Sequence, residues 1–130
     1  MKILIAEDDY ASRAFLSNIM SKYGQCDLTV DGIEALDAYF IALEDNEPYD
    51  IICLDIMMPK VDGLKVYKTI RASETERGVP ENQRVKVIVT SALANTTRLF
   101  SEGSENDVYL VKPITVDKIV EVLTRFGVIR

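Results

Sequence analysis

Charged side chains stand directly after several short apolar segments of the sequence. Glu7 and Asp8 follow KILIA, Asp55 follows DIICL, and Lys112 follows VYLV. A carboxylate at the end of a buried strand loses hydration, which is costly unless partners compensate for it. We therefore expect the other charged residues to be partners of Asp55.

A hard divalent cation would suit these groups. Glu7, Asp8 and Asp55 close together would raise one another's pKa values, and Lys112 offsets only one negative charge. All-oxygen ligands favour Mg²⁺, with Mn²⁺ as an alternative. The chain has no histidine, which excludes imidazole ligands, Ser-His or Cys-His catalysis, and a phosphohistidine on this chain.

A cation that binds phosphate gives the neighbouring groups roles in phosphoryl transfer. Lys112 would bind a phosphoryl oxygen, and the Ser91 hydroxyl would donate to another, although Thr90 competes for that role. Asp55 would then be free to attack phosphorus and form an aspartyl phosphate.

The elements that must bring these residues together alternate along the chain. Strands are expected at Lys2–Ala6, Cys26–Val30, Asp50–Leu54, Val85–Thr90 and Val108–Val111. Helical periodicity is expected around residues 15–23, 36–43, 64–70, 93–102 and 119–126, the second helix being opened by an Asp31 cap. This alternation predicts an α/β fold: a doubly wound, flavodoxin-like parallel sheet of five strands in the order 2-1-3-4-5, with five helices.

The predicted fold explains why distant residues would meet. Ligands of open parallel sheets bind beyond the carboxyl ends of the strands, and each charged residue above stands at such an end. The polar stretch Ala72–Arg84 is expected to be an exposed loop within the domain. Asp9 and Asp62 are interpreted as helix-opening residues rather than as members of the site.

Length and composition limit the protein class. The chain of 130 residues is 48% hydrophobic, which predicts one domain over residues 1–130 with no output domain. The absence of a long apolar run and of a signal-peptide cleavage site predicts a cytoplasmic protein without a membrane partner. The net charge of −6 argues against nucleic-acid binding, and Cys26 and Cys53 are expected to be buried, reduced thiols.

The segments ILIAEDD, LDIMMPKVDG, TSA and YLVKP, in this order and spacing, resemble the receiver domain of two-component response regulators. The resemblance covers essentially the whole chain and is to the stand-alone type, such as chemotaxis and phosphorelay regulators. It implies that Asp55 is the phosphoacceptor and that Asp8 binds the metal. Glu7 would assist, often through water, and Met57 would provide its backbone carbonyl.

The resemblance also assigns the remaining groups. Ser91 would be the phosphate-binding hydroxyl, because the family residue precedes an alanine, as Ser91 does. Lys112 would be the phosphate-binding lysine, with a cis bond to Pro113, and Tyr109 the switch aromatic. From its residues alone, Tyr109 is better explained as a half-buried strand aromatic, and its switch role rests on the resemblance.

The implied function is that of a phosphoacceptor signalling module rather than an enzyme, beyond self-catalysed phosphoryl acceptance and slow autodephosphorylation. A histidine kinase or histidine phosphotransfer protein would supply the phosphoryl group. The signal would leave for an unknown downstream protein through the face formed by residues 93–102, the fifth strand and the last helix.

Three other functions are compatible with parts of the sequence. A phosphohydrolase with an aspartyl nucleophile would need an acid two residues after Asp55, where Met57 stands. A flavin-binding electron carrier would not place Glu7 and Asp8 beside a phosphate. A degenerate receiver that acts only as a binding module remains an alternative.

Overall fold

The structure is a computed structural model and describes residues 1–92 and 105–129. Within these residues five strands and four α-helices alternate, with a short 3₁₀-helix, in the order β1 (Lys2–Ala6), α1 (Tyr10–Met20), β2 (Gln25–Thr29), α2 (Gly32–Glu44), β3 (Ile51–Asp55), α3 (Gly63–Glu76), η1 (Glu81–Gln83), β4 (Lys86–Ser91), β5 (Asp107–Val111) and α4 (Val116–Arg125). The predicted order of strands along the chain is confirmed.

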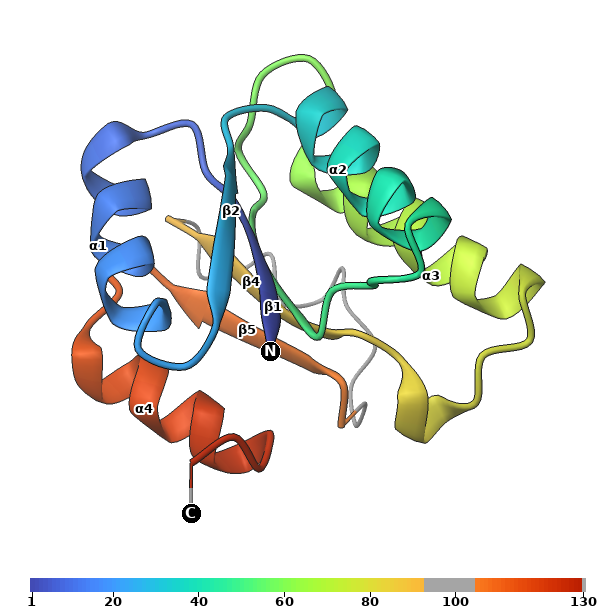
Figure 1. Cartoon of the computed structure of the whole chain (residues 1–130). Helices are drawn as coiled ribbons and strands as arrows, with labels where there is room; N and C mark the ends of the chain where they lie inside the picture. The colour runs from blue at the N-terminus through green and yellow to red at the C-terminus, as the bar shows by residue number, and fades with distance from the viewer. Residues whose placement is uncertain (93–104, 130) are drawn as a thin grey trace.

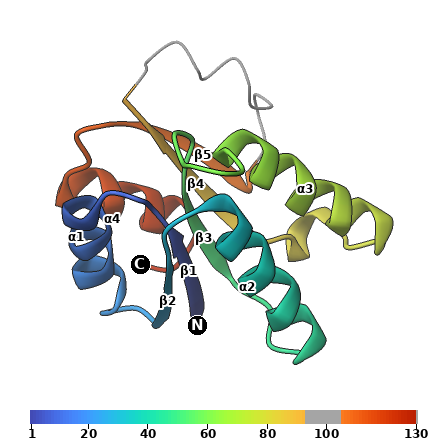
Figure 2. The same ribbon diagram turned by 90° about the horizontal axis from the view of Figure 1, so that it is seen from above.

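The five strands form one parallel sheet in the order β2-β1-β3-β4-β5. Helices α1 and α4 cover one face of this sheet, and α2 and α3 cover the other (Figures 1 and 2). The α/β class, the doubly wound architecture and the flavodoxin-like strand order are therefore confirmed. The predicted helix over residues 93–102 lies outside the described residues.

The side chains of the central strand β3 point alternately to the two faces of the sheet, and the core therefore has two layers. Ile52 and Leu54 of β3 pack in the layer under α2 and α3. Ile51 and Cys53 pack in the layer under α1 and α4. Because successive side chains point to opposite faces, Asp55 continues the second series and lies on the α1 side of the sheet.

Aspartates open three of the helices. The carboxylates of Asp9, Asp31 and Asp62 accept hydrogen bonds from the backbone N–H groups of the third following residue, at 2.9 Å in each case. These contacts confirm that Asp9, Asp31 and Asp62 are N-caps. The Glu34 carboxylate also accepts from the backbone N–H of Val30, directly before the Asp31 cap, so both residues satisfy backbone donors at the start of α2.

The predicted ends of β3 and β4 are each wrong by one residue. Asp55 and Ser91 are the last residues of β3 and β4 rather than the first residues after them, because both take part in strand pairing. The predicted exposed loop Ala72–Arg84 is also wrong: α3 continues to Glu76, and Glu74 is buried. Glu74 is accommodated because its carboxylate accepts from the Arg71 guanidinium and from the Val85 N–H.

Both cysteines are free thiols. Cys53 is buried, and this burial raises its pKa to about 12, whereas Cys26 is only partly buried. Among the residues that the structure describes, no helix combines the length and the apolar character needed to cross a membrane.

Candidate functional site

The charged residues named from the sequence converge at the carboxyl edge of the sheet. The Lys112 ammonium group, directly after β5, donates to Glu7 Oε1 at 2.7 Å. The same nitrogen lies 3.5 Å from Asp55 Oδ2 at the end of β3. One lysine thus contacts both carboxylates, which stand on neighbouring strands.

Glu7, Asp8 and Asp55 form an acidic cluster, with one carboxylate oxygen from each lying within 4.8 Å of the others. Glu7 and Asp55 are 1% and 3% exposed, while Asp8 faces solvent. Glu7 Oε2 is a buried side-chain oxygen without a hydrogen-bond partner among the described residues. An unpaired buried oxygen beside two further carboxylates fits a hard divalent cation such as Mg²⁺ or Mn²⁺.

The electrostatics of the cluster reflect the crowding of negative charge. Burial, together with the neighbouring Glu7 carboxylate, raises the pKa of Asp55 to about 8. Burial acts in the same direction on Glu7, but Asp55 and the Lys112 ammonium group outweigh it and hold the pKa of Glu7 below its usual value. Burial lowers the pKa of Lys112, but its two carboxylate partners outweigh this effect and raise that pKa. Without a cation the two buried acids therefore favour sharing one proton.

The backbone after β3 holds the Asp55 side chain. Asp55 Oδ1 accepts a hydrogen bond from the Met57 N–H at 3.1 Å, and the Ile56 N–H donates to the Thr90 carbonyl at 3.0 Å. The Met57 side chain is 60% exposed, so this residue supports the site through its backbone. The role of the Met57 carbonyl as a metal ligand stays a prediction.

Gly63 lets α3 begin against the backbone of Asp55. A Cβ on Gly63 would lie 2.1 Å from the Asp55 carbonyl oxygen and 2.7 Å from the Ile56 Cα. Both neighbours are backbone atoms, so neither can move aside without shifting the end of β3.

We expect Gly63→Ala to lower the free energy of unfolding by about 2–3 kcal/mol, because the added methyl group overpacks this contact. Urea denaturation measures the change. Gly78→Ala is the control: it is an exposed position with φ +68° and open space around it, where about 1 kcal/mol is expected from backbone strain alone. Equal losses in the two variants would contradict the close contact at Gly63.

The two hydroxyl residues at the end of β4 lie on opposite sides of the sheet. Ser91 is fully buried and continues the side of Val89, which packs in the layer under α2 and α3. Thr90 instead lines a cavity of about 480 Å³ together with Glu7 and Lys112. Thr90, which the sequence analysis ranked below Ser91, is therefore a neighbour of the acidic cluster.

Arg13 is a further neighbour that the sequence analysis missed. Its guanidinium group donates to the backbone carbonyls of Glu7 at 2.9 Å and Asp8 at 3.3 Å. The sequence does contain a signal for this role: Arg13 stands one turn into the helix that follows Glu7 and Asp8. Arg13 fixes the loop that carries two of the three carboxylates.

The structure also describes two further features that the resemblance implied, the Lys112–Pro113 peptide bond and Tyr109. The Lys112–Pro113 peptide bond is cis, as the resemblance implied. Tyr109 pairs in register with Val89 of β4 and packs at the border of the core under α2 and α3.

Comparison with known proteins gives consistent matches. The family described as "Response regulator receiver domain" matches residues 3–124. Hybrid signal transduction histidine kinase L of Dictyostelium discoideum is 30% identical over 130 residues, covering 97% of this chain and 7% of the kinase. The chain spans less than half the length of the first curated relatives that it matches.

Solved structures share the fold over nearly the full chain. A chain of the CheX–CheY–BeF3–Mg²⁺ complex from Borrelia burgdorferi is 26% identical with a TM-score of 0.76, and the match covers 97% of this chain and 89% of that one. Response regulator protein TrrA of Thermotoga maritima, in complex with Mg²⁺–BeF, is 25% identical with a TM-score of 0.73 and 98% coverage of both chains.

Proposed function

Because the chain belongs to the response regulator receiver family, we propose that it takes a phosphoryl group from a partner phosphohistidine onto Asp55 and signals through the resulting change. Members of this family are phosphoacceptor modules of two-component signalling rather than enzymes. Met57 stands where a phosphohydrolase would need its acid, and it has no proton to transfer.

The observation that carries this proposal is the position of the Asp55 carboxylate. It is buried beside Glu7 and Asp8, and the Lys112 ammonium group lies 3.5 Å from its Oδ2. Carboxylate nucleophiles form covalent aspartyl phosphates, and the positive charge of Lys112 would stabilise the incoming phosphoryl oxygens.

The proposed step transfers a phosphoryl group from a nitrogen of the partner to an oxygen of Asp55. An oxygen of Asp55 forms the new bond to phosphorus while the bond from phosphorus to the partner's imidazole nitrogen breaks, and the electron pair leaves with that nitrogen. Mg²⁺, held by Glu7, Asp8 and Asp55 with the predicted Met57 carbonyl, would neutralise charge on the transferring phosphoryl oxygens. The product is an acyl phosphate on Asp55.

The sheet register supports the proposed switch. Ser91 pairs with Val111 and Val89 pairs with Tyr109, so Ser91 and Tyr109 stand on adjacent strands and on the same side of the sheet. Ser91 continues the opposite side of the sheet from Asp55, so its hydroxyl would have to reach past the end of β4 to a phosphoryl group on Asp55. That movement would change the packing next to Tyr109. The altered surface would be the one around β5 and α4, as the sequence analysis proposed together with residues 93–102.

The donor would be a histidine kinase or a histidine phosphotransfer protein, because the chain has no histidine of its own. The similarity to a hybrid histidine kinase supports this kind of pathway. We place the reaction in the cytoplasm with an unidentified downstream protein, and we retain a stand-alone receiver as the proposed domain organisation.

The test is phosphorylation of the purified chain by acetyl phosphate with Mg²⁺. One phosphoryl group should add per chain, and hydroxylamine should remove it because it is an acyl phosphate. Mg²⁺ or Mn²⁺ should support the reaction, whereas chelation by EDTA should prevent it. Mass spectrometry of the intact chain measures the occupancy.

Several outcomes would count against the proposal. A hydroxylamine-stable adduct would indicate modification of a hydroxyl group rather than a carboxylate. No adduct under any condition would favour the degenerate receiver, and continuous hydrolysis of a phosphomonoester would favour the phosphohydrolase.

A further inference from the structure

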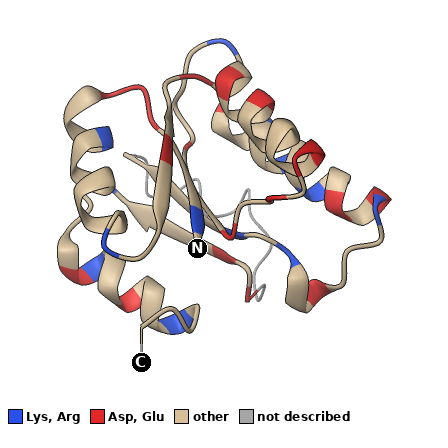
Figure 3. Ribbon diagram, in the orientation of Figure 1, with Lys and Arg blue, Asp and Glu red and all other residues tan. Residues whose placement is uncertain are grey.

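The negative charge of this protein is concentrated in one part of the sequence. Residues 23–59 contain nine of the 21 acidic residues and none of the 15 basic residues. The remainder of the chain has 12 acidic and 15 basic residues, so this segment is strongly negative while the rest of the chain carries a small positive charge. Helix α2 lies in its middle, and acidic positions line this helix in Figure 3.

Helix α2 carries apolar side chains on its solvent side as well as on its buried side. Ala35, Tyr39 and Ala42 face the core, as expected for a helix packed on a sheet. Ile33, Phe40 and Ile41 are nevertheless 46%, 39% and 56% exposed. Exposed apolar side chains grouped on one helix often mark a surface that a partner covers.

The exposed apolar residues lie on one face. Ile33, Phe40 and Ile41 stand at the spacing i, i+7 and i+8, and Asp37 and Glu44 fall between and after them at i+4 and i+11. We call these five residues the outer face of α2. The Phe40 ring rests edge-on against the buried Tyr39 ring, with centroids 5.1 Å apart, which fixes its position.

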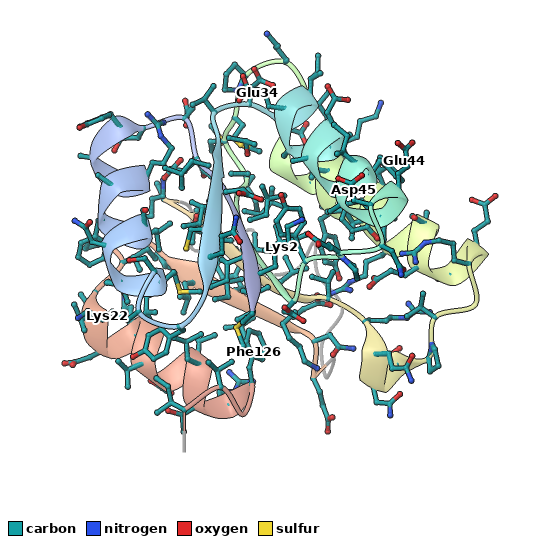
Figure 4. All side chains as sticks on the ribbon, viewed as in Figure 1. Lys2, Lys22, Glu34, Glu44, Asp45 and Phe126 are labelled. Carbon is teal, nitrogen blue, oxygen red and sulfur yellow. The ribbon has the colours of Figure 1, made fainter. Side chains whose placement is uncertain are left out.

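The charges at the rim of the outer face are acidic. Figure 4 shows Glu34 near the start of α2, and Glu44 and Asp45 near its end. Two nearby cations already have partners: Lys60 pairs with Asp31 at 3.3 Å, and the Arg77 guanidinium donates to the Tyr39 hydroxyl at 2.9 Å. The outer face is therefore an apolar stripe within a negative field.

We propose that the outer face of α2 binds a basic amphipathic helix of a partner protein. Apolar residues of the partner helix would cover Ile33, Phe40 and Ile41, while its Lys and Arg residues would pair with Asp37, Glu44 and the acidic rim. A second copy of this chain would bring two acidic faces together, and an anionic membrane or a nucleic acid would be repelled. This surface is separate from the acidic cluster around Asp55, so the inference does not rest on the proposed function.

The test selects a phage-displayed library of random 16-residue peptides on the full chain. Enriched peptides should be rich in Lys and Arg and should carry apolar residues at helical spacing. In synthetic form their binding should weaken as NaCl rises from about 0.05 to about 0.5 M, since salt screens exposed charges. Backbone amide shifts in NMR spectra of the ¹⁵N-labelled chain should concentrate on α2.

Variants test the apolar and the acidic residues of the outer face separately. Ile41→Ser and the double change Asp37→Lys with Glu44→Lys should each weaken peptide binding by about tenfold or more. Tyr10→Ser and Val116→Ser, which alter exposed apolar residues on other helices, should leave it unchanged. Circular dichroism and thermal unfolding confirm that each variant is folded.

Other outcomes overturn the proposal. No enrichment, enrichment of acidic or uncharged peptides, or amide shifts located away from α2 would each exclude the stated partner. Dimerisation seen by sedimentation and lost in Ile41→Ser would assign the face to a second copy. Flotation with anionic vesicles that is lost in the same variant would assign it to a membrane.

Discussion

Replacing Asp55 by Asn is expected to abolish phosphoryl uptake from acetyl phosphate while leaving the protein folded. The amide keeps the shape of the side chain and an oxygen that can accept from the Met57 N–H, so the local hydrogen bond survives. It loses the carboxylate nucleophile and a ligand of the proposed cation. Intact-mass measurement should show no adduct after an incubation that labels the unchanged chain.

The same substitution should stabilise the metal-free protein. It removes one of two buried acids that compete beside a single lysine, and replacing an unfavourable buried charge often increases stability by about 1–2 kcal/mol. Adding Mg²⁺ should raise the unfolding temperature of the unchanged chain and should have little effect on Asp55→Asn. Thermal unfolding with and without Mg²⁺ measures both effects.

Asp62→Asn is the matched control for Asp55→Asn. It makes the same chemical change a few residues away, at an N-cap that asparagine can also occupy. Uptake and the response to Mg²⁺ should be unchanged in this variant. Phosphoryl uptake that persists in Asp55→Asn, or an equal loss in Asp62→Asn, would exclude Asp55 as the acceptor.

The sheet and its charged edge could be predicted because both depend on local patterns. Apolar segments of strand length alternate with helical periodicity, and this alternation implies a parallel sheet. The parallel sheet in turn places Glu7, Asp55 and Lys112 together, although 105 residues separate Glu7 from Lys112. Fold topology, rather than residue spacing, therefore carried the prediction of the site.

Contacts between side chains of different elements were harder to predict. The sequence analysis treated Glu74 as part of an exposed loop, because a buried charge interrupts the apolar periodicity that marks a helix. Its burial depends on Arg71 and on the Val85 N–H, and neither partner is recognisable before the fold is known. The position of Thr90 beside Lys112 likewise depends on where β4 ends, which propensity alone leaves uncertain by a few residues.

The Arg71 guanidinium group joins α3 to the start of β5. It pairs with the carboxylates of Glu74 and Asp107, both almost fully buried. The Tyr67 hydroxyl donates to the second oxygen of Asp107 at 2.7 Å, and Arg71 also donates to the Asn106 carbonyl at 3.3 Å. The two carboxylates thus depend on one cation for compensation of their charge.

We expect Arg71→Met to lower the free energy of unfolding by about 3–5 kcal/mol, because it leaves two buried carboxylates without their counter-charge. Urea denaturation at neutral pH measures this loss. Arg77→Met is the control on the same helix: Arg77 is exposed, and its bonds to Tyr39 and Ser73 should contribute no more than about 1 kcal/mol.

The triple variant Arg71→Met, Glu74→Gln, Asp107→Asn separates charge from packing. Neutral amides do not need a counter-charge, so this variant should recover part of the stability that Arg71→Met loses. If the triple variant is instead the least stable of the set, the hydrogen bonds of the carboxylates matter more than their charges. A loss below about 1 kcal/mol in Arg71→Met would contradict the role of the guanidinium group altogether. Because Asp107 begins the strand that leads to Tyr109 and Lys112, a large loss would mean that the proposed switch strand is anchored at its end farthest from the phosphoacceptor.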